Sequence, residues 1–313
     1  MNQTSYTYLD ETARAVISGS DDARIHHILT SHYITYGRIG RLFKELQFEL
    51  IKPPSTRPWG IAVKAESHQG KTMFAKHVMK SFPPAPATSQ HPSTRPIVMI
   101  SMTDAREART IYTRLLEALD IEPPGPRGLK VAEREHLIKQ LLRDAGTILL
   151  IVDEISDVLQ VTTRQRELAL HAIKYIMNSL TLPVLALGTT MAMEAFREDP
   201  HMAARFRSVE LPKWKANREL AELLKGFESW LPLREPSRLH DPKLMRLLVE
   251  LSDGVLGKVA RTISYAAVFA VLDGTERITP EHLKRGASDI PVEALELSPD
   301  NADRKQETRS SYE

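Results

Sequence analysis

Residues 59–76 read WGIAVKAESHQGKTMFAK. Ile61 to Val63 are expected to form a short buried strand, residues 65–70 a loop, and Thr72 and its successors a helix. A strand, a loop, Gly-Lys-Thr and a helix, in that order, make up the context that a phosphate-binding P-loop requires. The stretch therefore predicts an α/β nucleotide-binding core, around which the other segments are placed.

The predicted loop supplies groups that hold a nucleotide. Its backbone N–H groups and the helix N-terminus would face the phosphates, where peptide dipoles favour negative charge. Lys71 would reach the β- and γ-phosphates of ATP, and the Thr72 hydroxyl would bind Mg²⁺. The expected nucleotide-binding residues are Ala65, Glu66, Ser67, His68, Gln69, Gly70, Lys71 and Thr72. Ala65 stands where the usual pattern has a glycine, and alanine tolerates fewer backbone angles. The alternative is an ordinary helix start that contains Gly-Lys-Thr by chance.

A second stretch, TILLIVDE at 147–154, ends in two carboxylates. Its continuous apolar run is typical of a strand buried on both faces of a parallel sheet. Asp153 lies at the C-terminal end of that strand, where ligands bind in open α/β sheets. We expect Asp153 to hold Mg²⁺ and to contact the nucleotide site, and Glu154 to orient the water that attacks the γ-phosphate. Either acid alone could be a solvated charge, but the pair after a P-loop favours an ATPase.

Composition narrows the class of protein. The chain has 313 residues, 42% of them hydrophobic and 26% charged, with a net charge of +2. Nucleic-acid binding would therefore depend on a local basic patch or on many copies side by side. The absence of cysteine excludes disulfides, thiolate metal sites and cysteine nucleophiles. No apolar run approaches the ~20 residues that span a bilayer, and the N-terminus has no signal-peptide pattern. We expect a cytoplasmic protein without a membrane partner.

The order of elements predicts the domain organisation. Expected strands at 61–63, 97–101, 147–153 and 183–188 alternate with helices, which implies βαβ units and a parallel sheet. We expect an N-terminal helical extension at 1–54, the α/β core at 55–212, a small all-α lid at 213–290 and a flexible tail at 291–313. Within the extension, residues 1 to about 20 are polar, and we expect them to be loosely held.

A P-loop core followed by a helical lid resembles the AAA+ ATPases. The resemblance implies that Thr189, at the tip of the fourth strand, senses the γ-phosphate. It also implies that Arg205, just before the fifth strand, reaches the nucleotide of a neighbouring subunit. Arg207 competes for this role, and a solvated surface charge is the alternative. In the lid, a second sensor would be Lys258, which would then contact the nucleotide, or Arg261.

Several segments are more specific than the P-loop, and over most of residues 20–290 they resemble the TniB family, with its relatives TnsC and MuB. They are Asp22-Ala-Arg-Ile25, Leu211-Pro-Lys-Trp-Lys-Ala-Asn217, Leu231-Pro-Leu-Arg-Glu-Pro-Ser-Arg-Leu239 and Ser252-Asp-Gly-Val-Leu-Gly257. This resemblance implies an AAA+ regulator that selects target DNA for a DDE-type transposase. Such a protein would polymerise on duplex DNA with ATP as a ring or filament, work with a target-selection protein, recruit the transposase, and disassemble on hydrolysis.

The candidate DNA-contacting residues are four basic residues in two segments of the core. Arg106 and Arg109 follow the second strand, while Arg127 and Lys130 lie in or after a glycine-proline loop. They could touch phosphates with little sequence preference, or they could be solvated charges. Two other functions stay open. One is an ATP-gated signalling or initiator switch whose partner is mainly protein. The other is a small-molecule kinase, which the helical lid and the Arg205 segment oppose.

Overall fold

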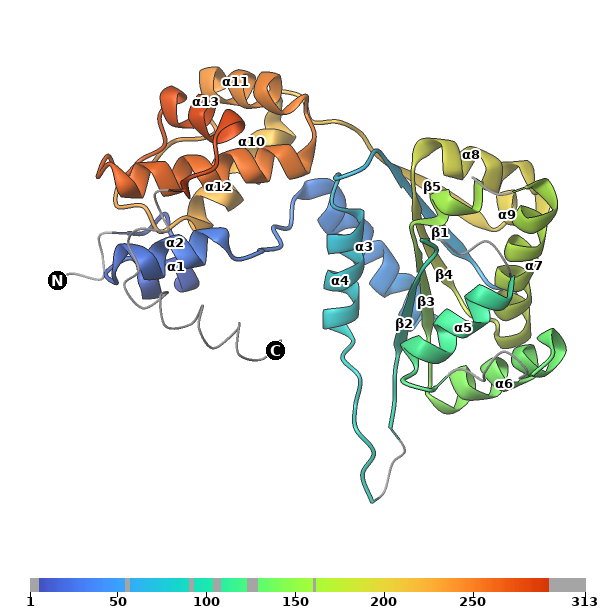
Figure 1. Cartoon of the computed structure of the whole chain (residues 1–313). Helices are drawn as coiled ribbons and strands as arrows, with labels where there is room; N and C mark the ends of the chain where they lie inside the picture. The colour runs from blue at the N-terminus through green and yellow to red at the C-terminus, as the bar shows by residue number, and fades with distance from the viewer. Residues whose placement is uncertain are drawn as a thin grey trace, which may run out of the picture. The chain divides into compact units, whose positions relative to one another are not determined.

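The computed structural model describes residues 6–53, 57–89, 93–103, 108–122, 129–159 and 162–292. The chain forms two compact units. One, the sheet unit, comprises Arg41–Pro212, and the other, the helical unit, comprises Met1–Gly40 together with Lys213–Glu313. Figure 1 shows the elements of both units in chain order. The tail expected at 291–313 lies outside the described residues from position 293 onward.

The sheet unit is built on a parallel sheet whose strands lie in the order β2-β3-β4-β1-β5. The strands are β1 (Gly60–Ala65), β2 (Ile97–Ser101), β3 (Leu149–Asp153), β4 (Val184–Gly188) and β5 (Phe206–Leu211). β3 and β4 are buried at every residue, because helices cover both faces of the sheet. The edge strand β5 is largely exposed. The α/β class and the parallel sheet predicted from the sequence are confirmed.

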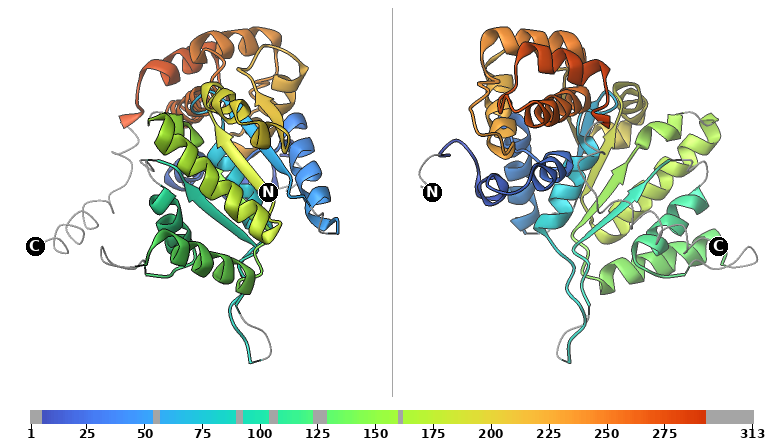
Figure 2. Two further views of the ribbon diagram at one scale, coloured as in Figure 1. Left: turned by 90° about the vertical axis from the view of Figure 1, so that its right-hand side faces the viewer. Right: turned by 60° about the vertical axis from the view of Figure 1, so that its left-hand side comes forward.

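Helices form a layer on each face of this sheet (Figures 1 and 2). One layer holds α4 (Lys71–Ser81) and the part of α3 (Gly37–Ile51) that follows Gly40. The other layer holds α5 (Ala108–Ala118), α6 (Val131–Asp144) and α7 (Thr163–Leu180), whose apolar side chains join those of the strands in one core. Short helices complete the unit: η1 (Ile155–Leu159), α8 (Thr190–Glu198) and α9 (Pro200–Ala203). Because the strands are parallel, their C-terminal ends all lie at the same edge of the sheet.

A proline-rich segment at 82–96 lies between α4 and β2. The described part of 82–96 is exposed along most of its length and projects from the sheet unit (Figure 2). Ala85 and Thr94 form an isolated antiparallel bridge, with N–O distances of 3.0 and 2.8 Å. Prolines lack a backbone donor and so keep this segment out of regular structure.

The helical unit contains α1 (Glu11–Val16), α2 (Asp21–Leu29), α10 (Arg218–Trp230), α11 (Pro242–Ser252), α12 (Leu256–Leu272) and α13 (Pro280–Ser288). Ile25 and Ile28 of α2 lie in the same apolar core as Leu220, Leu224 and Ile263. The N-terminal segment up to Gly40 is therefore part of the lid's fold. This differs from the expectation of a separate extension at 1–54, because α2 buries its apolar face against helices from the other end of the chain.

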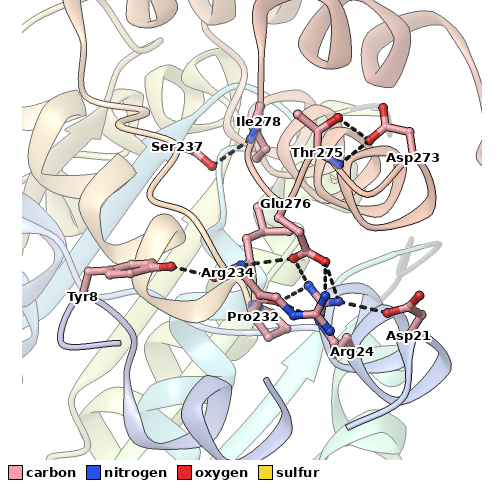
Figure 3. Close-up of polar contacts among 11 residues, drawn as sticks. Tyr8, Asp21, Arg24, Pro232, Arg234, Ser237, Asp273, Thr275, Glu276 and Ile278 are labelled. Atoms are coloured by element: carbon pink, nitrogen blue, oxygen red, sulfur yellow. Dashed lines mark hydrogen bonds and ion pairs between the residues drawn. The ribbon is translucent and has the colours of Figure 1, made fainter. Parts of the chain in front are cut away.

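A buried ionic network joins α2 to the C-terminal helices (Figure 3). Arg24 is fully buried and donates through Nε and Nη2 to the Pro232 carbonyl, at 3.0 and 2.9 Å. Its Nη1 lies 2.9 Å from Asp21 Oδ1 and 2.9 Å from Glu276 Oε1. Glu276 also accepts from the backbone N and from Nη1 of Arg234, at 3.1 and 3.0 Å. Buried charges persist only when they are paired in this way.

The segment before α2 is more ordered than expected. α1 begins at an N-cap, Asp10, whose side chain accepts from Ala13 N at 2.9 Å. Leu9, Ala13 and Ile17 form a small buried cluster. They are spaced four residues apart, as on one face of a helix. From Tyr6 onward, the expectation of a loosely held segment is wrong. A few apolar residues in this polar stretch are enough to pack a short helix in place.

Within the described residues, no single helix is long and apolar enough to cross a membrane. α11 and α12 meet the length and composition criteria only as a pair bent by 117°.

Candidate nucleotide site

The loop after β1 has the backbone shape of an anion cradle. Gly70 has a φ of 83°, a left-handed conformation that favours glycine, and His68 shares it with a φ of 61°. Gly70 is also the N-cap of α4 and has no side chain with which to cap that helix. The loop thus turns into a helix N-terminus whose first N–H groups carry partial positive charge.

Ala65 fits its place without strain. It is the last residue of β1, is 2% exposed, and pairs with Leu211 of β5. An extended backbone is open to alanine, so the strand conformation does not require the glycine that is usual at this position.

Lys71 lies inside the curve of the loop. Its Nζ donates to the carbonyl oxygens of Ala65 and Glu66, at 3.0 and 2.8 Å, and the residue is 5% exposed. Burial lowers the pKa of the Lys71 ammonium, and the charges of Glu154 and Asp153 oppose that shift. The loop therefore holds a cation in position for phosphate groups.

Thr72 and Asp153 join the loop to the acidic strand. Thr72 Oγ1 donates to Asp153 Oδ2 at 2.7 Å, although β4 separates β1 from β3 in the sheet. Asp153 is 3% exposed, and its other oxygen accepts from Glu154 N at 2.9 Å. A hydroxyl and a carboxylate side by side are the oxygen donors that Mg²⁺ takes from proteins, alongside waters and phosphates. The residues present therefore fit a nucleotide-bound Mg²⁺.

Glu154 and Thr189 lie at the same edge of the sheet. Glu154 has a φ of 51°, a left-handed conformation that is strained for glutamate. Thr189 follows β4, and its Oγ1 accepts from Ser156 Oγ at 3.1 Å, while its N–H donates to the same oxygen at 3.0 Å. Sequence reasoning missed Ser156, because one serine after an acidic pair carries no motif. Only the position of η1 beside the end of β4 identifies it.

Arg205 does not join this group. It immediately precedes β5, and its carbonyl accepts from Gly60 N, at the start of β1, at 3.0 Å. The P-loop follows the other end of β1, roughly 16 Å away at about 3.3 Å per residue. The Arg205 Nη1 donates to Asn178 Oδ1 on α7. Its competitor Arg207 forms an ion pair with Glu45 on α3.

The predicted second-sensor and DNA-contacting residues lie in segments other than the P-loop. Lys258 and Arg261 belong to the helical unit, at exposed positions of α12. Arg106 and Arg127 lie outside the described residues. Arg109 is in the first turn of α5, and Lys130 is the N-cap of α6, where its N–H donates to Glu133 Oε2 at 2.7 Å. DNA contact by these residues stays a prediction.

Comparison with known proteins locates the chain among families. The model of the family described as bacterial TniB protein matches residues 24–216, which is more than half of the chain. The segments at 231–239 and 252–257 lie beyond the matched range. A comparison with curated proteins found no match.

Solved structures show the fold. The Aeropyrum pernix ORC2 protein, in ADPNP–ADP complexes, is 17% identical over 87% of this chain and 74% of that chain, with a TM-score of 0.61. Drosophila ORC bound to DNA is 14% identical over 87% and 66%, with a TM-score of 0.58. Cdc6p from Pyrobaculum aerophilum is 14% identical over 83% and 69%, with a TM-score of 0.56. At such low identity the similarity concerns the fold alone, which is that of the AAA+ ATPases.

Proposed function

Because the chain belongs to the bacterial TniB family, we propose that it is an ATP-dependent regulator of DNA transposition. It binds and hydrolyses ATP, assembles as a ring or filament on duplex DNA, and recruits a DDE-type transposase together with a target-selection protein. Hydrolysis then disassembles it. The observation that carries this proposal is the 2.7 Å hydrogen bond from Thr72 to Asp153, which joins the P-loop to the acidic strand.

Each residue at the edge of the sheet has a role in this proposal. Lys71 leaves its two loop carbonyls to bind the terminal phosphates. Thr72 and Asp153 hold Mg²⁺, which when bound neutralises phosphate charge. Glu154 orients the attacking water. Thr189, held by Ser156, contacts the γ-phosphate.

Arg205 acts on a neighbouring copy of the chain. Its backbone lies beside the start of β1, whereas the P-loop follows the other end of that strand, farther away than one arginine side chain reaches. Arg207 is already paired with a carboxylate, so Arg205 is the better candidate. The active form is then an oligomer whose sites are completed across interfaces.

DNA binding is proposed for the basic residues Arg106, Arg109, Arg127 and Lys130. Contacts of this kind are to phosphates, so binding falls as salt rises and depends little on sequence. An ATP-gated initiator or signalling switch has the same fold, and it is the outcome that a failed DNA test would favour.

The test is ATP hydrolysis and assembly with and without duplex DNA. We expect DNA to stimulate hydrolysis, and ATP with DNA to produce assemblies visible by negative-stain microscopy. Lys71→Ala should abolish both, while Lys76→Ala, which removes an exposed lysine from the same helix, should leave both intact. Hydrolysis that ignores DNA, without assemblies, would contradict the transposition proposal.

A further inference from the structure

We propose that Asn178 is the positioning residue of Arg205, holding its guanidinium in place for a neighbouring copy. The inference rests on the proposed role of Arg205 in trans. Its basis is the hydrogen bond from Arg205 Nη1 to Asn178 Oδ1, which joins residues 27 positions apart.

Asn178 lies on a helix that is packed against the core of the sheet unit. It belongs to α7, whose first turn is closed by reciprocal contacts between Thr162 and Gln165, with N–O distances of 3.3 and 3.4 Å. Ile176 and Met177, which precede Asn178, are buried in the core of the sheet unit, while Asn178 itself is exposed. The backbone that carries the Asn178 carboxamide is thus held at the surface by a packed helix.

The backbone of Arg205 is fixed as well. Its N–H donates to the Met202 carbonyl at 3.1 Å, and its carbonyl accepts from Gly60 N at 3.0 Å. The ring of Phe206, the next residue, packs edge-on against Phe196, with 4.6 Å between the ring centroids. Only the Arg205 side chain is therefore free to reorient, and the Asn178 carboxamide determines where it points.

Among the described residues, no carboxylate lines the surface hollow beside the Arg205 guanidinium. Arg205 and Asn178 lie on the wall of a hollow of about 450 Å³ that His171, Lys174 and His201 also line. Every lining residue is in the described part of the chain, and none of them is an acid. Lys174, which lines the same hollow, forms an ion pair with Asp199 at 2.6 Å. The acceptor of the Arg205 guanidinium is thus a neutral amide, whereas Arg207 is paired with the carboxylate of Glu45.

The hydrogen bond between Arg205 and Asn178 is weak enough for the guanidinium to leave Asn178 and bind a phosphate of a neighbouring copy. The bond joins a charged donor to a neutral acceptor, so it lacks the attraction between opposite charges that a carboxylate acceptor would add. A phosphate of a neighbouring copy can therefore displace the amide, but it would compete poorly with a carboxylate in the same place. Asparagine rather than aspartate at position 178 follows from that requirement.

Two substitutions test the role because they separate orientation from charge. Asn178→Ala should lower the kcat of the DNA-assembled ATPase roughly threefold to tenfold, because an exposed hydrogen bond that orients the guanidinium is lost, without changing the nucleotide Kd of the monomer. Asn178→Asp should lower it further, by roughly tenfold or more, because the new carboxylate retains the guanidinium. Sedimentation with a non-hydrolysable ATP analogue supplies a second readout, in which Asn178→Asp should weaken assembly more than Asn178→Ala.

The order of the two variants is decisive. If Asn178 were only a structural acceptor, Asn178→Asp would be the milder change, since it keeps the shape and the oxygen. That order, or wild-type behaviour of both variants, would overturn the proposal. Glu167→Ala, at an exposed position of α7, serves as the surface control and should match the wild type.

The Arg205→Ala background distinguishes the two proposals. There, neither Asn178 variant should change the nucleotide Kd or the melting temperature of the monomer further, because the group that Asn178 positions is gone. An additional loss in that background would overturn the role of Asn178 alone. Wild-type hydrolysis by Arg205→Ala itself would instead refute the action of Arg205 in trans, and the role of Asn178 with it.

Discussion

At the scale of single residues, Glu154 combines strain with a fixed position. Its φ is 51°, and its N–H is held by Asp153 Oδ1 at 2.9 Å. A glutamate keeps a left-handed backbone only where its surroundings enforce it, at a cost of about 1–3 kcal/mol, and such residues cluster at functional sites. The strain therefore supports the role that the sequence predicted for this acid.

Glu154→Gln should bind ATP normally and hydrolyse it slowly. Glutamine keeps the size of the side chain but loses the charge that orients water, and groups of this kind contribute roughly 10²–10⁴ in rate. Single-turnover hydrolysis and the lifetime of DNA-bound assemblies measure the effect, and the assemblies should outlive those of the wild type. Asp153→Asn should differ by weakening Mg²⁺-dependent binding. Unchanged turnover in Glu154→Gln would assign catalysis to another residue.

Gly254 connects two of the segments that carry the family resemblance. It has a φ of 64°, and its carbonyl accepts from Trp214 N at 2.8 Å. A Cβ on Gly254 would lie 2.4 Å from the Trp214 carbonyl oxygen, which is backbone and cannot swing aside. The segments at 211–217 and 252–257 therefore touch, although they lie far apart in the sequence.

Gly254→Ala should destabilise the protein by more than the cost of a left-handed alanine. That cost is about 1–3 kcal/mol, and the close contact adds to it. Gly274→Ala is the matched control, since Gly274 has a φ of 73° and nothing within 4 Å of its added Cβ. Denaturant unfolding of both variants isolates the contact with Trp214. An equal loss in both would show that the contact relaxes freely.

At the scale of elements, the attachment of α2 to the lid depends on its buried arginine. Removing one partner of a buried pair leaves an uncompensated charge, at a cost of about 3–5 kcal/mol. Arg24→Met and Glu276→Gln should each lower the free energy of unfolding by about that amount. The double variant should cost less than the sum, because the second change removes the group that the first left unpaired.

The control for this prediction is an exposed pair in the same unit. Arg218 and Glu222 lie one helical turn apart with a contact of 3.3 Å, and the Arg218 side chain is 93% exposed. Arg218→Met should shift stability by about 0.5 kcal/mol or less. Denaturant unfolding compares the variants, and equal effects at the two arginines would contradict the importance of the buried network.

At the scale of the whole molecule, the proposal requires sites shared between copies. Arginines supplied across an interface contribute about 10³–10⁵ in rate where they act on phosphoryl transfer. Arg205→Ala should bind ATP normally as a monomer, yet lose hydrolysis and cooperative assembly. Lys71→Ala should fail to bind ATP while keeping a sound Arg205. Mixing these two inactive proteins should restore part of the activity, measured as ATP hydrolysis on DNA. If they assemble together and restore nothing, Arg205 does not act in trans.

Local patterns were sufficient to predict the centre of the molecule. The P-loop and the acidic strand each depend on neighbouring residues, so short motifs and hydrophobic runs identify them. The α/β class and the parallel sheet follow from the same information.

Tertiary structure alone decided how distant segments meet. No local periodicity pairs Arg24 with Glu276, places Ser156 against Thr189, or brings Asn178 to Arg205, since each contact joins residues well separated along the chain. The placement of the N-terminal helices with the lid has the same origin. A short helix such as α2 is stable only when its apolar face packs against another surface. The sequence of α2 shows that apolar face, but it does not identify the surface that covers it.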